Sequence, residues 1–181
     1  MIMKVFNFFP TNVWVGNLDI DNKKLLSKIY KFSKRKKSET VSNEGGYQGH
    51  LLGDEEFYDK VIKCMPRQKD LYSYTIYDWV NINKKGSKNN RHYHYNSDLF
   101  LSGVYYVKVP ESSGRIRFYD PRGPFVRGAA DTVHFYGDNA YQYIVPQEGM
   151  ILFFPTWLEH DVEENQSDED RVSIAFNIKV E

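Results

Sequence analysis

The sequence predicts a mainly β, α+β fold: a jelly roll of short strands with two N-terminal helices packed on one sheet. Aromatic residues are abundant, with 14 Tyr, 12 Phe and 3 Trp, and they recur in short alternating runs typical of half-buried strands. Two segments with helical spacing precede a series of seven or eight such runs. Helices segregated at one end of an antiparallel series indicate an α+β domain, and the strand count favours a double-sheet jelly roll.

The chain length indicates one domain. A chain of 181 residues suits one sizeable hydrophobic core rather than two. We therefore expect a single domain over 1–181, with an N-terminal strand and helices in 1–70 and the jelly-roll core in 71–181.

The N-terminal part alternates between apolar and polar segments. Residues 1–20 predict a first strand, and the helical spacing of apolar residues in 19–37 predicts the first helix. Residues 38–50 are rich in Ser, Asn and Gly and predict a loop. Residues 54–65 predict a second helix, because acids occupy its start and Pro66 follows its end.

Alternation of side chains predicts a series of strands in the remaining sequence. These strands are 71–83, 99–109, 115–119, 132–136, 141–145, 150–154 and 171–180. The longest irregular stretch is "DPRGPFVRGAADTVHFYGDN", residues 120–139. Long segments of this kind in compact domains are usually functional, so it is a candidate lid.

Charge and cysteine content limit the partners and the compartment. Lys+Arg and Asp+Glu are equal at 24 each, so no overall field favours nucleic acid or an anionic membrane. Cys64 is the only cysteine and cannot form an internal disulfide, which fits a reducing, cytoplasmic location. The sequence has no signal peptide pattern and no apolar run long enough for a membrane span.

Two histidines stand one residue apart in "NNRHYHYNSDLFLSGVYY", residues 89–106. We expect strands 71–83 and 99–109 to pair and His92 and His94 to lie at the entrance to the second. Side chains at i and i+2 of an extended segment point the same way. Both imidazoles can therefore face one cavity, where they would suit a divalent transition metal.

The third metal ligand has two candidates. His160 follows an apolar strand and a Pro-containing turn, where its side chain can be directed back toward the pair. Asp98 could instead supply a carboxylate, as in sites with two histidines and one carboxylate, or it could cap the turn before the next strand. His50 lies in the Gly-rich loop and His134 in the candidate lid, so both are weaker candidates.

The last strand carries a second chemical signal. In "DEDRVSIAFNIKV" the apolar residues alternate with Arg171, Ser173, Ala175 and Asn177. A guanidinium with a neighbouring hydroxyl is well suited to a carboxylate, although an ordinary solvated strand face would give the same pattern. With His160 eleven residues earlier, this face predicts a dicarboxylate that chelates the metal and meets Arg171.

These residues also carry a family resemblance. "HYHYNSDLFLSGVYYVKVPESSGRIRFYDPRG" and "PQEGMILFFPTWLEHDVEENQSDEDRVSIAFN" resemble the 2-oxoglutarate and iron(II)-dependent oxygenases related to prolyl 4-hydroxylases. The resemblance is to small members from bacteria and from phages of cyanobacteria. It covers about the last hundred residues, with weaker similarity in "FPTNVWVGNLD", "SNEGGYQGH" and "DWVNINKKG".

The resemblance implies a double-stranded β-helix, a cupin-like jelly roll, with Fe(II) and 2-oxoglutarate bound inside it. It implies a dioxygenase of the hydroxylase type that uses O2, with ascorbate as a candidate stimulant. By this resemblance His160 matches the distal iron histidine and Arg171 the residue that pairs with the far carboxylate of 2-oxoglutarate. Ser173 would assist that carboxylate, and Tyr106 would hydrogen-bond the cosubstrate.

The near ligand pair departs from the family pattern. The pattern is His-x-Asp, whereas this chain has His92-Tyr93-His94, so His94 stands where the carboxylate is expected. A site of three histidines and a site that uses Asp98 both remain open. Two other functions also remain: a cupin-like metal enzyme that does not use 2-oxoglutarate, and a non-enzymatic jelly-roll binding protein. The sequence does not choose between a small-molecule and a peptidyl substrate, nor does it indicate an oligomeric state.

Overall fold

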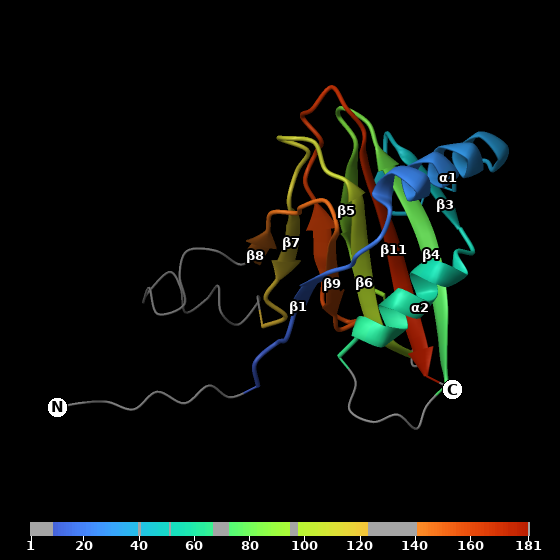
Figure 1. Cartoon of the computed structure of the whole chain (residues 1–181). Helices are drawn as coiled ribbons and strands as arrows, with labels where there is room; N and C mark the ends of the chain where they lie inside the picture. The colour runs from blue at the N-terminus through green and yellow to red at the C-terminus, as the bar shows by residue number, and fades with distance from the viewer. Residues whose placement is uncertain are drawn as a thin grey trace, which may run out of the picture.

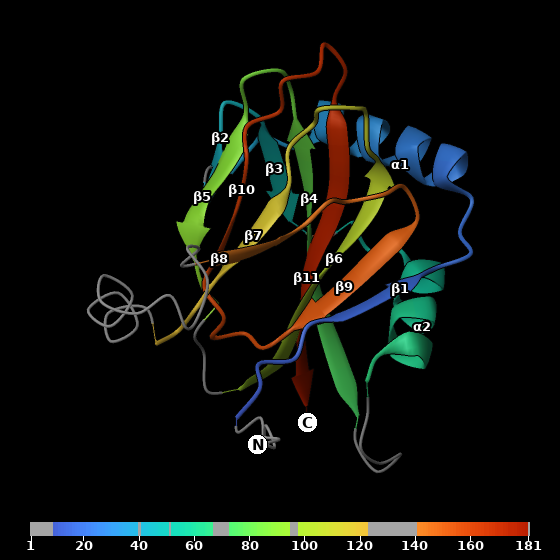
Figure 2. The same cartoon turned by 90° about the vertical axis from the view of Figure 1, so that its left-hand side faces the viewer.

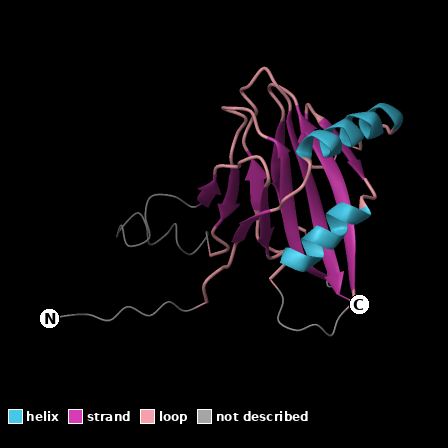
Figure 3. Ribbon diagram, viewed as in Figure 1, coloured by secondary structure: helices cyan, strands magenta, loops and turns pink. Residues whose placement is uncertain are grey.

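The computed structural model describes residues 9–39, 41–50, 52–66, 73–94, 98–122 and 141–180. Two sheets face each other, and two helices cover the outer face of the larger sheet (Figures 1 and 3). The elements are β1 (Trp14–Asn17), α1 (Asn22–Arg35), β2 (Asn43–Glu44), β3 (Tyr47–His50), α2 (Glu55–Cys64), β4 (Tyr74–Asn83), β5 (Lys88–His92), β6 (Leu99–Lys108), β7 (Ile116–Tyr119), β8 (Tyr141–Ile144), β9 (Met150–Phe154), β10 (His160–Val162) and β11 (Arg171–Val180).

The strand order is that of a jelly roll. The larger sheet has the order β1-β9-β6-β11-β4-β3 and the smaller sheet the order β2-β5-β10-β7-β8, and every neighbouring pair is antiparallel. Figure 2 shows the smaller sheet in front of the larger one. The predicted fold class is therefore confirmed, with the site region lying between the two sheets.

Both helices begin at a capping aspartate. The side chain of Asp21 accepts a hydrogen bond from Lys24 N at 3.0 Å, and Asp54 accepts one from Phe57 N at 3.0 Å. Each cap satisfies an amide that the first helical turn leaves without an intrahelical partner. The observed helices begin at Asn22 and Glu55, close to the starts of the predicted segments 19–37 and 54–65.

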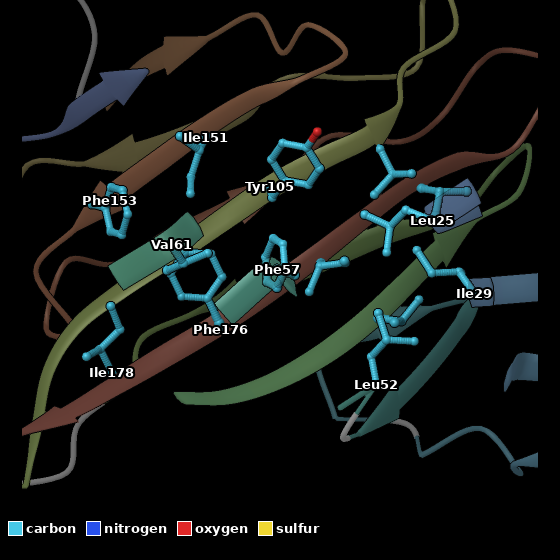
Figure 4. Close-up of a cluster of buried hydrophobic side chains, with 14 of the residues drawn as sticks. Leu25, Ile29, Leu52, Phe57, Val61, Tyr105, Ile151, Phe153, Phe176 and Ile178 are labelled. Carbon is cyan, nitrogen blue, oxygen red and sulfur yellow. The ribbon is translucent and has the colours of Figure 1, made fainter. Parts of the chain in front are cut away.

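The main hydrophobic core lies between the helices and the larger sheet (Figure 4). The residues that Figure 4 labels in it include Leu25 and Ile29 of α1, Phe57 and Val61 of α2, Phe153 of β9, and Phe176 and Ile178 of β11. A second, smaller cluster contains Tyr106, Phe118 and Phe154 and lies between the sheets. Strand β11 contributes side chains to both sides of the larger sheet. Its apolar residues, at every second position from Val172 to Ile178, face the helices. The residues between them face the space between the two sheets.

The predicted loop at 38–50 is wrong, because it contains β2 and β3. Strand β3 pairs with β4, with Tyr47 opposite Ile82. The composition is explained by close packing: a Cβ at Gly46 would lie 2.4 Å from the backbone oxygen of Ile82, so only glycine fits. The buried Gln48 side chain also accepts a hydrogen bond from Ser42 N at 3.3 Å. Tertiary pairing thus overrides the local loop preference.

The predicted pairing of strands 71–83 and 99–109 is also wrong. Strand β11 lies between β4 and β6 and pairs with both. His92 consequently ends β5 on the smaller sheet instead of lying at the entrance to β6. The predicted strand at 132–136 and most of the candidate lid lie outside the described residues.

Within the described part of the chain, no helix has both the length and the apolar character needed to cross a membrane.

Candidate metal and cosubstrate site

Three histidines meet between the two sheets. His92 on β5 lies directly opposite His160 on the antiparallel strand β10. His94 follows two residues later, and its backbone N–H donates to the carbonyl oxygen of Thr156 at 2.8 Å. The possible ligand atoms of the three side chains all lie within 4.8 Å of one another. Among the described residues, this is the one group of His, Cys, Asp or Glu side chains that could hold a metal.

Backbone carbonyls orient two of these rings. The Nδ1 of His92 lies 2.6 Å from the oxygen of Asn90, and the Nδ1 of His160 lies 2.8 Å from the oxygen of Leu158. A carbonyl only accepts hydrogen bonds, so Nδ1 carries the proton in each neutral ring. The lone pair is then on Nε2, which is the atom available to a metal.

The environment keeps all three imidazoles neutral. Burial, together with a neighbouring imidazole, lowers the pKa of His160 to about 3 and that of His94 to about 4. Burial also lowers the pKa of His92. Because a metal ligand must be unprotonated, the cluster is ready to bind a cation at neutral pH. Three imidazoles suit a divalent transition metal such as Fe, Ni or Zn.

The structure does not bring Asp98 into this group. Its side chain is exposed, and its Oδ2 lies 3.7 Å from Lys179 Nζ at the end of β11. His50, the weaker candidate on β3, has its Nε2 at 3.5 Å from Glu39 Oε2. His134 lies outside the described residues.

Arg171 is buried in the same cavity as the histidines. It is 2% exposed, its Nη1 donates to Ser113 O at 3.0 Å, and its Nε has no hydrogen-bond partner. Burial lowers its pKa to about 10, so the guanidinium is still charged at pH 7. The alternative interpretation, an ordinary solvated strand face, is therefore excluded for Arg171.

Two hydroxyls accompany this guanidinium. Ser173 lies two residues along β11, and Tyr106 lies opposite it on β6. Burial raises the pKa of Tyr106, so its hydroxyl is a neutral donor. No acidic side chain lines the cavity in the described structure. A buried cation without a counterion is costly, and the unpartnered Nε is a donor without an acceptor. These groups fit a bound carboxylate.

Other residues of the cavity received no role from the sequence. Trp79 and Asn81 of β4 line it together with Asn89 of β5, whose Nδ2 donates to Asn81 Oδ1 at 3.3 Å. The sequence does contain a signal for Trp79 and Asn81, because the alternation of side chains places both on the same face of a strand. Asn89 had no signal, because β5 itself was not predicted.

A second, more open cavity of about 310 Å³ adjoins the first. The two cavities share four lining residues, Ser42, Trp79, His92 and His94. The walls that belong only to the second include Gln48, Asn90, Tyr93 and Asn177. We call it the outer groove. The outer groove reaches the histidine cluster from the side of β3 and β5. We call the first cavity, which is lined by Arg171, the inner cavity.

The fold and site together define a jelly-roll protein in which three histidines that could hold a metal share a cavity with a buried arginine. Residues 78–177 match the family model described as "Putative 2OG-Fe(II) oxygenase". This match covers more than half of the chain, and the chain belongs to the family of 2-oxoglutarate and Fe(II)-dependent oxygenases. It is accordingly a dioxygenase with Fe(II) and 2-oxoglutarate as its cofactor and cosubstrate.

Solved structures show the same fold. A prolyl-4-hydroxylase of Pseudomonas putida is 13% identical with a TM-score of 0.65, and the match covers 93% of this chain and 92% of that one. A prolyl hydroxylase of Trichoplax adhaerens, solved with a peptide fragment, is 15% identical with a TM-score of 0.65, covering 92% and 83%. HygX of Streptomyces hygroscopicus, with nickel and 2-oxoglutarate bound, is 13% identical with a TM-score of 0.64, covering 93% and 83%. No curated protein matches the chain.

Proposed function

We propose that His92, His94 and His160 hold Fe(II), that Arg171 anchors 2-oxoglutarate, and that the enzyme hydroxylates a substrate bound in the outer groove. Bound Fe(II) supplies the activation of O2 that couples decarboxylation of 2-oxoglutarate, to succinate and CO2, with oxidation of the substrate. The observation that carries the proposal is the shared cavity of three neutral imidazoles and a buried arginine without a counterion.

The metal site in this proposal has three neutral ligands. Two of them are pre-oriented by backbone carbonyls that contact Nδ1, which leaves Nε2 available to the metal. With a neutral imidazole at position 94 in place of a carboxylate, the net charge of the metal and its three protein ligands is more positive by one unit. That charge favours an anionic, chelating cosubstrate over a neutral one.

The cosubstrate would lie between the metal and Arg171. Its far carboxylate would accept from the guanidinium, whose Nε has no other acceptor, while the hydroxyls of Ser173 and Tyr106 would donate to the same group. These contacts are made in a cavity that is lined by Val104, Ile116 and Phe154 of the second hydrophobic cluster. Charge-assisted hydrogen bonds are strongest under such conditions.

The outer groove would receive the primary substrate, because it reaches His92 and His94 without passing Arg171. Its described walls offer amides at Gln48, Asn90 and Asn177 and no carboxylate. Both a peptidyl residue and a small molecule fit this description. One structure of similar fold is a prolyl-4-hydroxylase, and another, HygX, has hygromycin B bound.

Calorimetry with Mn(II) in place of Fe(II) tests the cosubstrate assignment without turnover. Wild-type protein should bind Mn(II) and then 2-oxoglutarate. Arg171→Ala should retain the metal and lose at least tenfold in 2-oxoglutarate affinity, since the loss of a charged hydrogen bond corresponds to about 1.5–3 kcal/mol. Arg115→Ala is the matched control, because Arg115 is paired with Glu163 on the surface. Unchanged affinity in Arg171→Ala would remove this assignment.

Turnover provides the second measurement. With Fe(II), ascorbate, O2 and 2-oxoglutarate, we expect slow release of succinate even without a primary substrate. A metal-loaded protein that neither binds 2-oxoglutarate nor releases succinate would contradict the proposed site. Addition of a true substrate should raise the rate and yield a product heavier by one oxygen atom.

A further inference from the structure

His94 is held differently from the other two histidines. His92 and His160 each donate Nδ1–H to a backbone carbonyl. In the described structure, neither ring nitrogen of His94 meets a hydrogen-bond partner. Its ring is instead surrounded by aromatic rings, with centroids at 4.9 Å from His92, 5.2 Å from His160 and 5.3 Å from Trp79. Its orientation therefore depends on packing.

Two of these three neighbours, His92 and His160, are themselves proposed metal ligands. The third, Trp79, is held in place by the fold and not by the metal site. It lies on β4, where its backbone is in register with His50 of β3 on one side and Ala175 of β11 on the other. The side chain is only 8% exposed. Its indole is tilted 44° to the His94 ring and contacts the His50 ring, at a centroid distance of 6.1 Å, as well.

We propose that Trp79 is a positioning residue whose indole holds the His94 imidazole in the orientation that binds the metal. This inference rests on the proposed function, in which His94 is a ligand. The indole substitutes for the backbone carbonyl that orients each of the other two ligands. It also lines both the inner cavity and the outer groove, as His94 does.

The nature of the ligand explains why an aromatic support is needed here. A carboxylate at position 94 would be attracted to the metal by its charge. A neutral imidazole lacks that attraction and must be ordered before the metal arrives. Groups that orient a ligand without touching the metal typically contribute 10–100-fold to its affinity. We therefore expect removal of the indole to weaken metal binding through His94 alone.

A double-mutant cycle with Co(II) tests this role. Calorimetry and the visible absorption of bound Co(II) would be measured for wild type, Trp79→Ala, His94→Ala and the double variant. Positioning through His94 predicts about a tenfold or larger loss of affinity and a changed Co(II) spectrum in Trp79→Ala. It predicts no further loss when Trp79→Ala is added to His94→Ala. Trp79→Phe should restore most of the affinity, and Trp14→Ala, on the edge strand β1, should leave it unchanged.

Each contrary outcome has a distinct meaning. An equal loss in both backgrounds would show that Trp79 only supports the fold, and it would overturn this inference. Wild-type affinity and spectrum in Trp79→Ala would do the same while leaving the proposed function intact. Failure of wild-type protein to bind Co(II) at all would overturn the proposed function itself. If Trp79→Ala does not fold by thermal melting, Trp79→Leu replaces it, because leucine keeps an apolar wall without an aromatic face.

Discussion

His92 and His160 face each other across the β5–β10 strand pair, in register and with ring centroids 4.4 Å apart. Adjacent antiparallel strands bring directly opposite side chains close together. Two of the three clustered imidazoles are therefore positioned by backbone pairing in the smaller sheet. The third, His94, lies beyond the end of β5. The open question about the ligand set is therefore whether His94 or Asp98 is the third ligand.

The first prediction concerns that third ligand. His94→Ala should lose bound metal by at least tenfold in affinity, because it removes one of three imidazoles that meet within 4.8 Å. Asp98→Ala should retain wild-type affinity, because Asp98 is exposed and near Lys179. Metal content after dialysis against limiting Fe(II) under anaerobic conditions measures both.

The reverse outcome would be informative. If Asp98→Ala released the metal and His94→Ala retained it, the ligand set would be two histidines and a carboxylate. Lys179→Ala is the control for the ion pair of Asp98. It removes the partner of the carboxylate without removing the carboxylate.

The second prediction concerns the cosubstrate. Tyr106→Phe should weaken 2-oxoglutarate binding by about fivefold, the equivalent of one neutral hydrogen bond of about 1 kcal/mol. Metal binding should not change. Tyr105→Phe is the matched control on the same strand: its hydroxyl donates to Asn22 Oδ1 at 2.7 Å on the helix side of the sheet. An equal effect of the two variants on 2-oxoglutarate would contradict a direct role for Tyr106.

Sequence patterns predicted the elements that have a strong period. The alternation along β11 correctly separated the residues that face the helices from Arg171 and Ser173, which face the inner cavity. The two helices were also predicted close to their observed positions. In each case the buried face and the solvent or cavity face differ in polarity, so the period is visible in the sequence.

In the smaller sheet, β7 and β8 match the predicted strands 115–119 and 141–145, whereas β5 and β10 were not predictable in the same way. Strand β5 reads "KNNRH" and β10 has three residues, His160–Val162. The buried polar residue of β5, Asn89, accepts a hydrogen bond at 3.0 Å from Asn83 of β4 on the facing sheet. Such pairs depend on tertiary contacts. The sequence therefore indicated the histidines as a group, but not the strand register that brings them together.

The third prediction concerns acid stability. Arg115 makes a bidentate pair with Glu163, with both N–O distances at 2.7 Å, and this pair links β7 to the end of β10. The hydrogen bond from Arg115 lowers the pKa of Glu163. A lowered folded-state pKa gives stability that is present above the unfolded-state value and is lost as pH falls through the folded-state value. Glu163→Gln should therefore reduce the free energy of unfolding at pH 7 by about 1 kcal/mol or less.

The difference between this variant and wild type should shrink as pH falls below the ordinary glutamate pKa of about 4.3 and on through the lower folded-state pKa of Glu163. Urea unfolding at pH 7 and at pH 3.5 measures the two differences. Glu164→Gln is the control, since Glu164 is exposed and its side chain accepts a hydrogen bond from the neighbouring Gln166. If the difference in free energy of unfolding between Glu163→Gln and wild type were the same at both pH values, the pair would stabilise the fold through packing and not through its charge.

The fourth prediction separates the core from the site. Phe57 of α2 is 1% exposed and contacts Tyr105 and Phe176 at centroid distances of 5.7 and 6.0 Å. Phe57→Ala should lower the free energy of unfolding by about 3–5 kcal/mol, because it leaves a cavity between the helix and the larger sheet. Phe57→Leu should cost less, since it fills more of that space. Because the metal cluster lies on the opposite face of this sheet, the folded fraction of both variants should bind Co(II) with wild-type affinity in calorimetry at low temperature. Weakened binding by fully folded Phe57→Leu would show that the helix side of the sheet shapes the metal site.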